Sequence, residues 1–195
     1  MSAEPEREHW LRRLDATGKV QARYLWLTLI AGLFFAALRL GAADSQTITV
    51  PVVDVEIDAL SVQASGGPIL AFLVLATLGA IRAWTHALEQ FRGASPAEDA
   101  EQLDISPNAL DLAIYTTDKS PSIVRRILYF IYPTYLVAAL VESGWLLVWT
   151  CTAPVVPARY GFMAAGAITW VPATILVLAM VMRRVRQVGD LGRTS

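Results

Sequence analysis

The chain has 195 residues, of which 55% are hydrophobic and 17% are charged, and its formal net charge is −1. A charge this close to zero gives no reason to expect nucleic acid as a partner. The single cysteine, Cys151, excludes an internal disulfide and argues against a thiolate metal site. The strongly apolar composition instead indicates a membrane protein.

The polar segment before the first apolar stretch is not expected to be a secretory signal, because its acidic residues nearly balance its basic ones. Within it, residues 5–15 predict a short helix, and Pro5 suits the first turn of a helix. Trp10, Leu11 and Leu14 share one face of that helix. Such a face suits the inner membrane surface or the protein's own cytoplasmic loop equally well.

Four apolar stretches are close to the length of about 20 residues that a bilayer core requires. We therefore predict four transmembrane helices at about 24–41, 68–86, 123–150 and 160–183. Together they form a single four-helix domain over residues 1–195, an all-α membrane protein with a short β-containing outer loop and a helical inner loop.

Lysine and arginine gather before the first stretch, between the second and third, and after the fourth. The other two connections carry only Arg159, and Arg39 lies near the far end of the first stretch. Because positive residues near the ends of spans stay cytoplasmic, both termini are predicted to be inside. For a bacterial protein this means a multi-pass location in the inner membrane.

The outer loop, residues 44–67, contains alternating β-branched and polar residues. Ile48 and Val50, and then Val53 to Ile57, follow the period of two that predicts one or two extracytoplasmic strands. Pro51 cannot donate to a strand ladder, so it predicts a bulge or an edge position. The run from Ser65 to Pro68 is expected to break the strand and to begin the second helix.

Residues 20–90 resemble a two-helix transmembrane hairpin found in uncharacterised bacterial membrane proteins. The resemblance is carried by the apolar run from Tyr24 to Asp44, by the strand Ile48–Ile57, and by the apolar helix that follows. In those proteins a Leu/Val-Pro-Leu-Leu-x-Val-x-Ile strand links two spans. The resemblance implies a bacterial inner-membrane accessory protein, and it brings no catalytic residue or substrate.

The inner loop, residues 89–122, is acidic and has repeated helix-start signals. Ser-Pro pairs at 95–96 and 106–107 predict short helices at about 96–104 and 107–116. The acidic residues that carry a candidate docking surface are Glu98, Asp99, Glu101 and Asp104. A solvated face of connecting helices is the simpler interpretation, and a surface for a basic cytoplasmic partner is the functional one.

Two charged residues, Arg39 and Glu142, fall deep inside predicted spans, far from the inner boundary, where ionisable groups are costly and often functional. At 1.5 Å per residue they lie about 22 Å and about 21 Å from the inner boundary. An intramembrane ion pair is therefore geometrically feasible. The alternatives are separate snorkelling to the outer interface, which the sequence favours, and a cation or proton pathway through Glu142.

Two prolines, Pro133 and Pro172, interrupt predicted spans and are expected to bend them, because proline cannot donate to the carbonyl four residues earlier. Arg82 and His86 lie one turn apart at the inner end of the second span, where an ordinary exit from the bilayer is the simpler interpretation. Neither histidine has a second ligand at the spacing that specifies zinc.

No hydrolase, metalloprotease, phosphate-loop or paired-cysteine motif occurs, so neither an enzyme nor a cofactor is expected. We predict a non-enzymatic inner-membrane sensor, scaffold or accessory subunit, with membrane lipid around it, a cytoplasmic protein as partner, and assembly into a homo-oligomer. The alternative is an oligomeric channel or membrane effector, for instance in stress response or phage defence.

Overall fold

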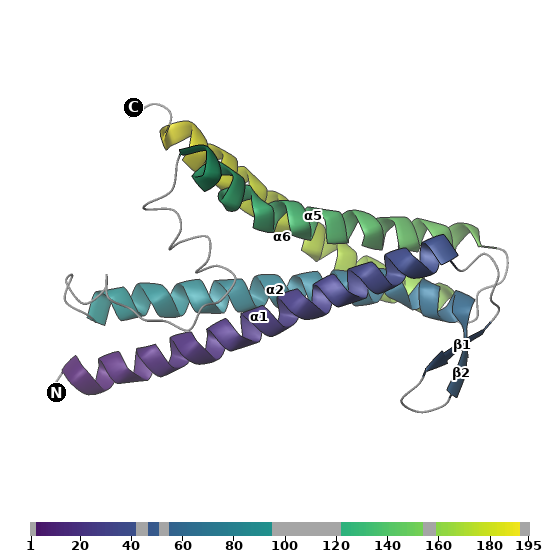
Figure 1. Cartoon of the computed structure of the whole chain (residues 1–195), viewed down its shortest axis with the longest axis horizontal. Helices are drawn as coiled ribbons and strands as arrows, with labels where there is room; N and C mark the ends of the chain where they lie inside the picture. The colour runs from purple at the N-terminus through teal and green to yellow at the C-terminus, as the bar shows by residue number, and fades with distance from the viewer. Residues whose placement is uncertain (1–2, 42–46, 51–54, 95–121, 154–158, 192–195) are drawn as a thin grey trace. The chain divides into compact units, whose positions relative to one another are not determined.

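The computed structural model describes residues 3–41, 47–50, 55–94, 122–153 and 159–191, and it is almost entirely helical (Figure 1). The elements are α1 (Ala3–Gly41), β1 (Thr47–Val50), β2 (Val55–Asp58), α2 (Ala59–Ala94), α5 (Ser122–Thr152) and α6 (Arg159–Leu191). Among the described residues, four helices are long and apolar enough to cross a membrane. Each contains one of the four predicted spans, so the chain is a multi-pass membrane protein by length and composition.

Helix α1 is one continuous helix of 39 residues, so the prediction of a separate short helix at 5–15 was wrong. At 1.5 Å per residue it is about 58 Å long, nearly twice the thickness of a bilayer core. Two ion pairs at helical spacing support its polar half: Glu8 with Arg12 at 2.5 Å, and Asp15 with Lys19 at 2.6 Å. The helix therefore leaves the apolar span without a break.

Helix α2 begins at Ala59, nine residues before the predicted start at Pro68. Asp58 caps it, because its Oδ2 accepts hydrogen bonds from the backbone nitrogen and the hydroxyl of Ser61, both at 2.9 Å. Pro68 lies inside the helix, where it removes the bond to the carbonyl of Ala64. The outer segment that was expected to be a loop is thus helical from residue 59 onward.

Removing the cap is expected to weaken this helix start. The hydrogen bond from the Ser61 hydroxyl is the main reason that the pKa of Asp58 lies below its ordinary value. A depressed pKa stabilises the fold above the unfolded value of about 3.9, and the contribution disappears as pH falls through the lower folded value. We expect Asp58→Ala to cost about 1 kcal/mol at neutral pH. The loss, measured by thermal unfolding in detergent, should be smaller at strongly acidic pH, where the neutral carboxyl is a weaker acceptor; an equal loss at both pH values would contradict a cap by the charged carboxylate.

Strands β1 and β2 form an antiparallel pair, with Thr47 opposite Asp58 and Val50 opposite Val55. The connecting residues 51–54, including the proline that was expected to form a bulge or edge, lie outside the described residues. That this pair lies on the outer side of the membrane stays a prediction.

The contacts divide the chain into two compact units: residues 1–26 with 76–130, and residues 27–75 with 131–195. In the first unit, the polar half of α1 lies beside the C-terminal part of α2 (Figure 1). Its largest fully buried side chains are Leu14, Trp84 and Phe91. An apolar, partly aromatic seam therefore holds these two helix segments together.

In the second unit, Phe35 of α1, Leu70 of α2 and Leu146 of α5 form a core cluster. Gly66 allows the close approach, because a Cβ there would lie 2.6 Å from the Phe35 ring and 2.9 Å from Leu146. Gly166 of α6 admits the Leu147 side chain in the same way. Gly66 and Gly166 are therefore explained by packing and not by turns.

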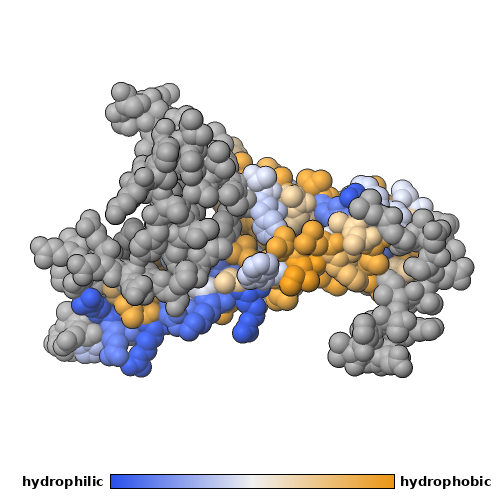
Figure 2. Space-filling view, viewed as in Figure 1, coloured by the Kyte–Doolittle hydropathy of each residue, from blue (hydrophilic) through white to orange (hydrophobic). Residues whose placement is uncertain are grey.

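The surface of the spans is apolar, whereas hydrophilic side chains gather along the N-terminal half of α1 (Figure 2). Helix α6 exposes Ile168, Val171, Ile175, Leu176, Leu178 and Met182. A helix with so much exposed apolar surface is suited to contact with lipid.

Candidate functional site

The structure brings Arg39 and Glu142 together in the second unit, where the sequence had favoured separate snorkelling. The Nη2 atom of Arg39 lies 3.6 Å from Oε2 of Glu142. The guanidinium carbon of Arg39 also lies 5.0 Å from the centre of the Trp145 ring. Glu142 and Trp145 are one turn apart on α5, so a single face of that helix holds the arginine by charge and by its aromatic ring.

The pair is an ion pair rather than a close hydrogen bond, because 3.6 Å exceeds the range of about 2.7 to 3.2 Å for such bonds. The side chains are 36% exposed for Arg39 and 17% exposed for Glu142. The second carboxylate oxygen, Oε1 of Glu142, is buried and has no hydrogen-bond partner among the described residues. The pair can therefore neutralise two intramembrane charges, and one acceptor on the carboxylate stays unoccupied.

Two hydrogen bonds beside Glu142 fix the position of α5. The hydroxyl of Ser143 donates to the carbonyl of Gly67 on α2 at 2.7 Å, and Ser143 is fully buried. The indole nitrogen of Trp170 on α6 donates to the carbonyl of Leu140 at 3.2 Å. The carboxylate is thus held on a helix that is bonded to α2 and α6, and among the described residues Arg39 compensates its charge.

Arg159, the one cation of the two connections that are predicted to lie outside, also has a local role. Its guanidinium donates to the carbonyl of Cys151 in the last turn of α5. The last carbonyls of a helix lack partners and carry partial negative charge, so a cation there is stabilising. Arg39 and Arg159, the two exceptions to the one-sided distribution of positive charge, therefore both have acceptors within the second unit.

An aromatic cluster in the first unit was not anticipated from the sequence. The Trp10 ring lies edge-on to His86 of α2, with 6.3 Å between ring centres, and Arg13 lies 5.4 Å from the Trp10 ring. The shared face of Trp10 and Leu14 pointed to this contact. That face meets α2, whereas the sequence had offered the membrane surface or the cytoplasmic loop.

The remaining predicted features are only partly described. Helices α5 and α6 continue through Pro133 and Pro172, and the bends expected there stay predictions. The acidic residues Glu98, Asp99, Glu101 and Asp104, with the helices predicted at 96–104 and 107–116, lie outside the described residues. In the part of the chain that the structure describes, no group of three or more metal-ligating side chains occurs.

Comparison with known proteins gives no relative: no family model, no curated protein and no solved structure matches the chain. The resemblance of residues 20–90 to a bacterial hairpin therefore stays a prediction.

Proposed function

We propose that the chain is a non-enzymatic scaffold or accessory subunit of a bacterial inner membrane, which acts with a cytoplasmic partner. The observation that carries this proposal is the continuation of α1 beyond its apolar span. A mostly polar segment, residues 3–23, extends the helix by about 31 Å. In the first unit, Leu14 of this segment and Trp84 and Phe91 of α2 are buried, and the Trp10 ring contacts His86 of α2.

This helix pair supports a role in connection rather than in chemistry. The largest buried side chains of the pair are apolar or aromatic, whereas its exposed side carries charged residues in ion pairs at helical spacing. A packed pair of helices is stiffer than a flexible linker of the same length. Helix α2 continues to Ala94, so the first residues of the predicted inner loop 89–122 belong to this helix. We infer that the helix pair joins the membrane spans to the acidic remainder of the loop, and that this part binds the partner.

A pore formed by several copies is less well supported. A pore needs polar side chains toward a shared axis, whereas the large exposed side chains of α1 and α6 within the spans are mostly apolar, with Arg39 as an exception. Two charges that lie deep within the spans, Arg39 and Glu142, compensate each other. The unoccupied oxygen of Glu142 is the feature that keeps the channel as an alternative.

Ion flux and partner binding separate the two functions. We expect purified protein in liposomes to give no ion flux above that of empty liposomes. Crosslinking in the native cells should recover one defined cytoplasmic protein. Its recovery should fail when Glu98, Asp99, Glu101 and Asp104 are changed to serine, because the acidic surface is lost.

The control changes the exposed acidic residue Glu6 to serine, which should leave recovery intact. Conductance by the protein alone, sensitive to Glu142→Gln and insensitive to the loop changes, would instead show the channel.

A further inference from the structure

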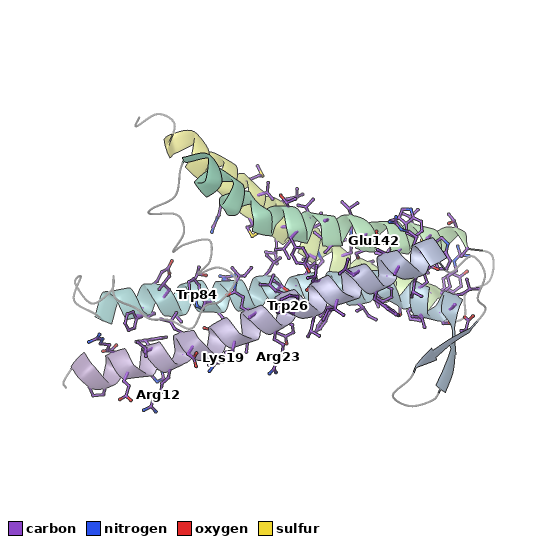
Figure 3. All side chains as sticks on the ribbon, in the orientation of Figure 1. Arg12, Lys19, Arg23, Trp26, Trp84 and Glu142 are labelled. Atoms are coloured by element: carbon purple, nitrogen blue, oxygen red, sulfur yellow. The ribbon has the colours of Figure 1, made fainter. Side chains whose placement is uncertain are left out.

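One exposed face of α1 changes from basic to apolar within a single turn. Arg12, Lys19 and Arg23 project from the same side of the helix (Figure 3). Trp26 and Ile30 continue that face at helical spacing, and they are 64% and 59% exposed. A charged face that ends at a tryptophan is typical of a helix that enters a bilayer at that point.

Two of the three cations on this face are paired with a carboxylate, and the third is not. Arg12 lies 2.5 Å from Glu8, and Lys19 lies 2.6 Å from Asp15. Arg23 has Lys19 and Leu27 as its neighbours one turn away, and it forms no ion pair within the described part of the chain. The uncompensated positive charge is therefore concentrated next to the tryptophan.

Helix geometry places these residues at different depths. Arg23 lies about 4.5 Å from Trp26 along the axis, and Lys19 lies about 10 Å from it. The headgroup layer is about 5 to 8 Å thick on each side of the hydrocarbon core, and both side chains are long enough to reach it. Arg12 lies about 21 Å from Trp26, which places it beyond the headgroups.

We propose that Lys19, Arg23 and Trp26 form a binding surface for the phosphate headgroup of an anionic phospholipid. The planar guanidinium of Arg23 binds phosphate oxygens in a bidentate manner, and Lys19 adds a point charge. The Trp26 indole lies at the level of the glycerol backbone, where tryptophan is enriched. This inference deepens the proposed function and rests on the insertion of α1 in the membrane, with its basic half in the cytoplasm.

The test measures lipid selectivity of the full chain in vesicles. The protein is reconstituted in phosphatidylcholine vesicles that hold a trace of spin-labelled phosphatidylglycerol or of spin-labelled phosphatidylcholine. Electron paramagnetic resonance then gives the fraction of each label that the protein immobilises. We expect a preference for phosphatidylglycerol that falls about fivefold in Arg23→Gln, since one basic residue near an anionic surface contributes about that factor.

Matched variants decide between a local site and general attraction. Lys19→Gln should reduce the preference less than Arg23→Gln, because Asp15 already compensates the lysine, and Arg12→Gln should leave it unchanged. Equal effects of Arg12→Gln and Arg23→Gln, or equal immobilisation of both labels by the wild-type protein, would overturn the proposal and leave the membrane assignment intact. Immobilisation of neither label would overturn insertion itself, and with it the proposed function.

Discussion

Replacing either Arg39 or Glu142 with leucine is expected to destabilise the protein strongly, whereas replacing both is expected to restore most of the loss. Each single change leaves one charge without its partner at low dielectric, which costs about 3 kcal/mol. For a chain of this size that corresponds to a fall in Tm of about 6 to 12 °C. The double change removes both charges and leaves two apolar side chains where the pair was.

Thermal unfolding of the wild type, both single variants and the double variant in the same detergent measures this coupling. Trp145→Leu is a useful companion, because it removes the ring beside Arg39 and keeps the ion pair. It should cost less than either charge removal. Losses that simply add in the double variant would mean that the two residues act separately, as snorkelling predicts.

Gly66→Ala is expected to be the most damaging change of a single methyl group among the described glycines of α2. The new Cβ would lie 2.6 Å from the Phe35 ring and 2.9 Å from Leu146, and both side chains belong to the buried cluster. Overpacking of this kind costs about 2 kcal/mol.

Gly79→Ala in the same helix is the matched control. A Cβ at residue 79 meets nothing within 4 Å, so the better helix propensity of alanine should leave stability unchanged or raise it by up to about 1 kcal/mol. Thermal unfolding compares the two variants directly. A loss at Gly79 as large as the loss at Gly66 would contradict the close approach of α1, α2 and α5.

The four membrane-spanning helices could be predicted from the sequence because apolar length depends on composition alone. The length of α1 before its apolar span and the position at which α2 begins could not be predicted. Gly18 is the weakest helix former between residues 15 and 24, and a single glycine costs a helix only about 1 kcal/mol, so the sequence did not require α1 to stop. At the start of α2, the Ser-Gly-Gly-Pro run is locally typical of a break. In the structure this run is helical, because Phe35 and Leu146 pack so close to residue 66 that only glycine fits there.

The candidate site was predictable in part. Equal depths along two helices of the same direction placed Arg39 and Glu142 at one level, because helix rise is constant. Depth does not say which way each residue faces around its helix axis, and this direction decides whether the two side chains meet. The ring of Trp145 over Arg39, and the bond of Ser143 to Gly67, depend on that rotation and on packing against α2.

Cysteine labelling in intact cells tests whether the protein crosses the membrane four times with both termini in the cytoplasm. With Cys151 changed to alanine, single cysteines replace Thr152 at the end of α5 and Gly93 at the end of α2; both residues are exposed. A maleimide that cannot cross the inner membrane should label residue 152 in intact cells. It should label residue 93 only after that membrane is permeabilised. Labelling of both residues in intact cells would contradict the four-span topology, because residues 93 and 152 would then lie on the same side of the membrane.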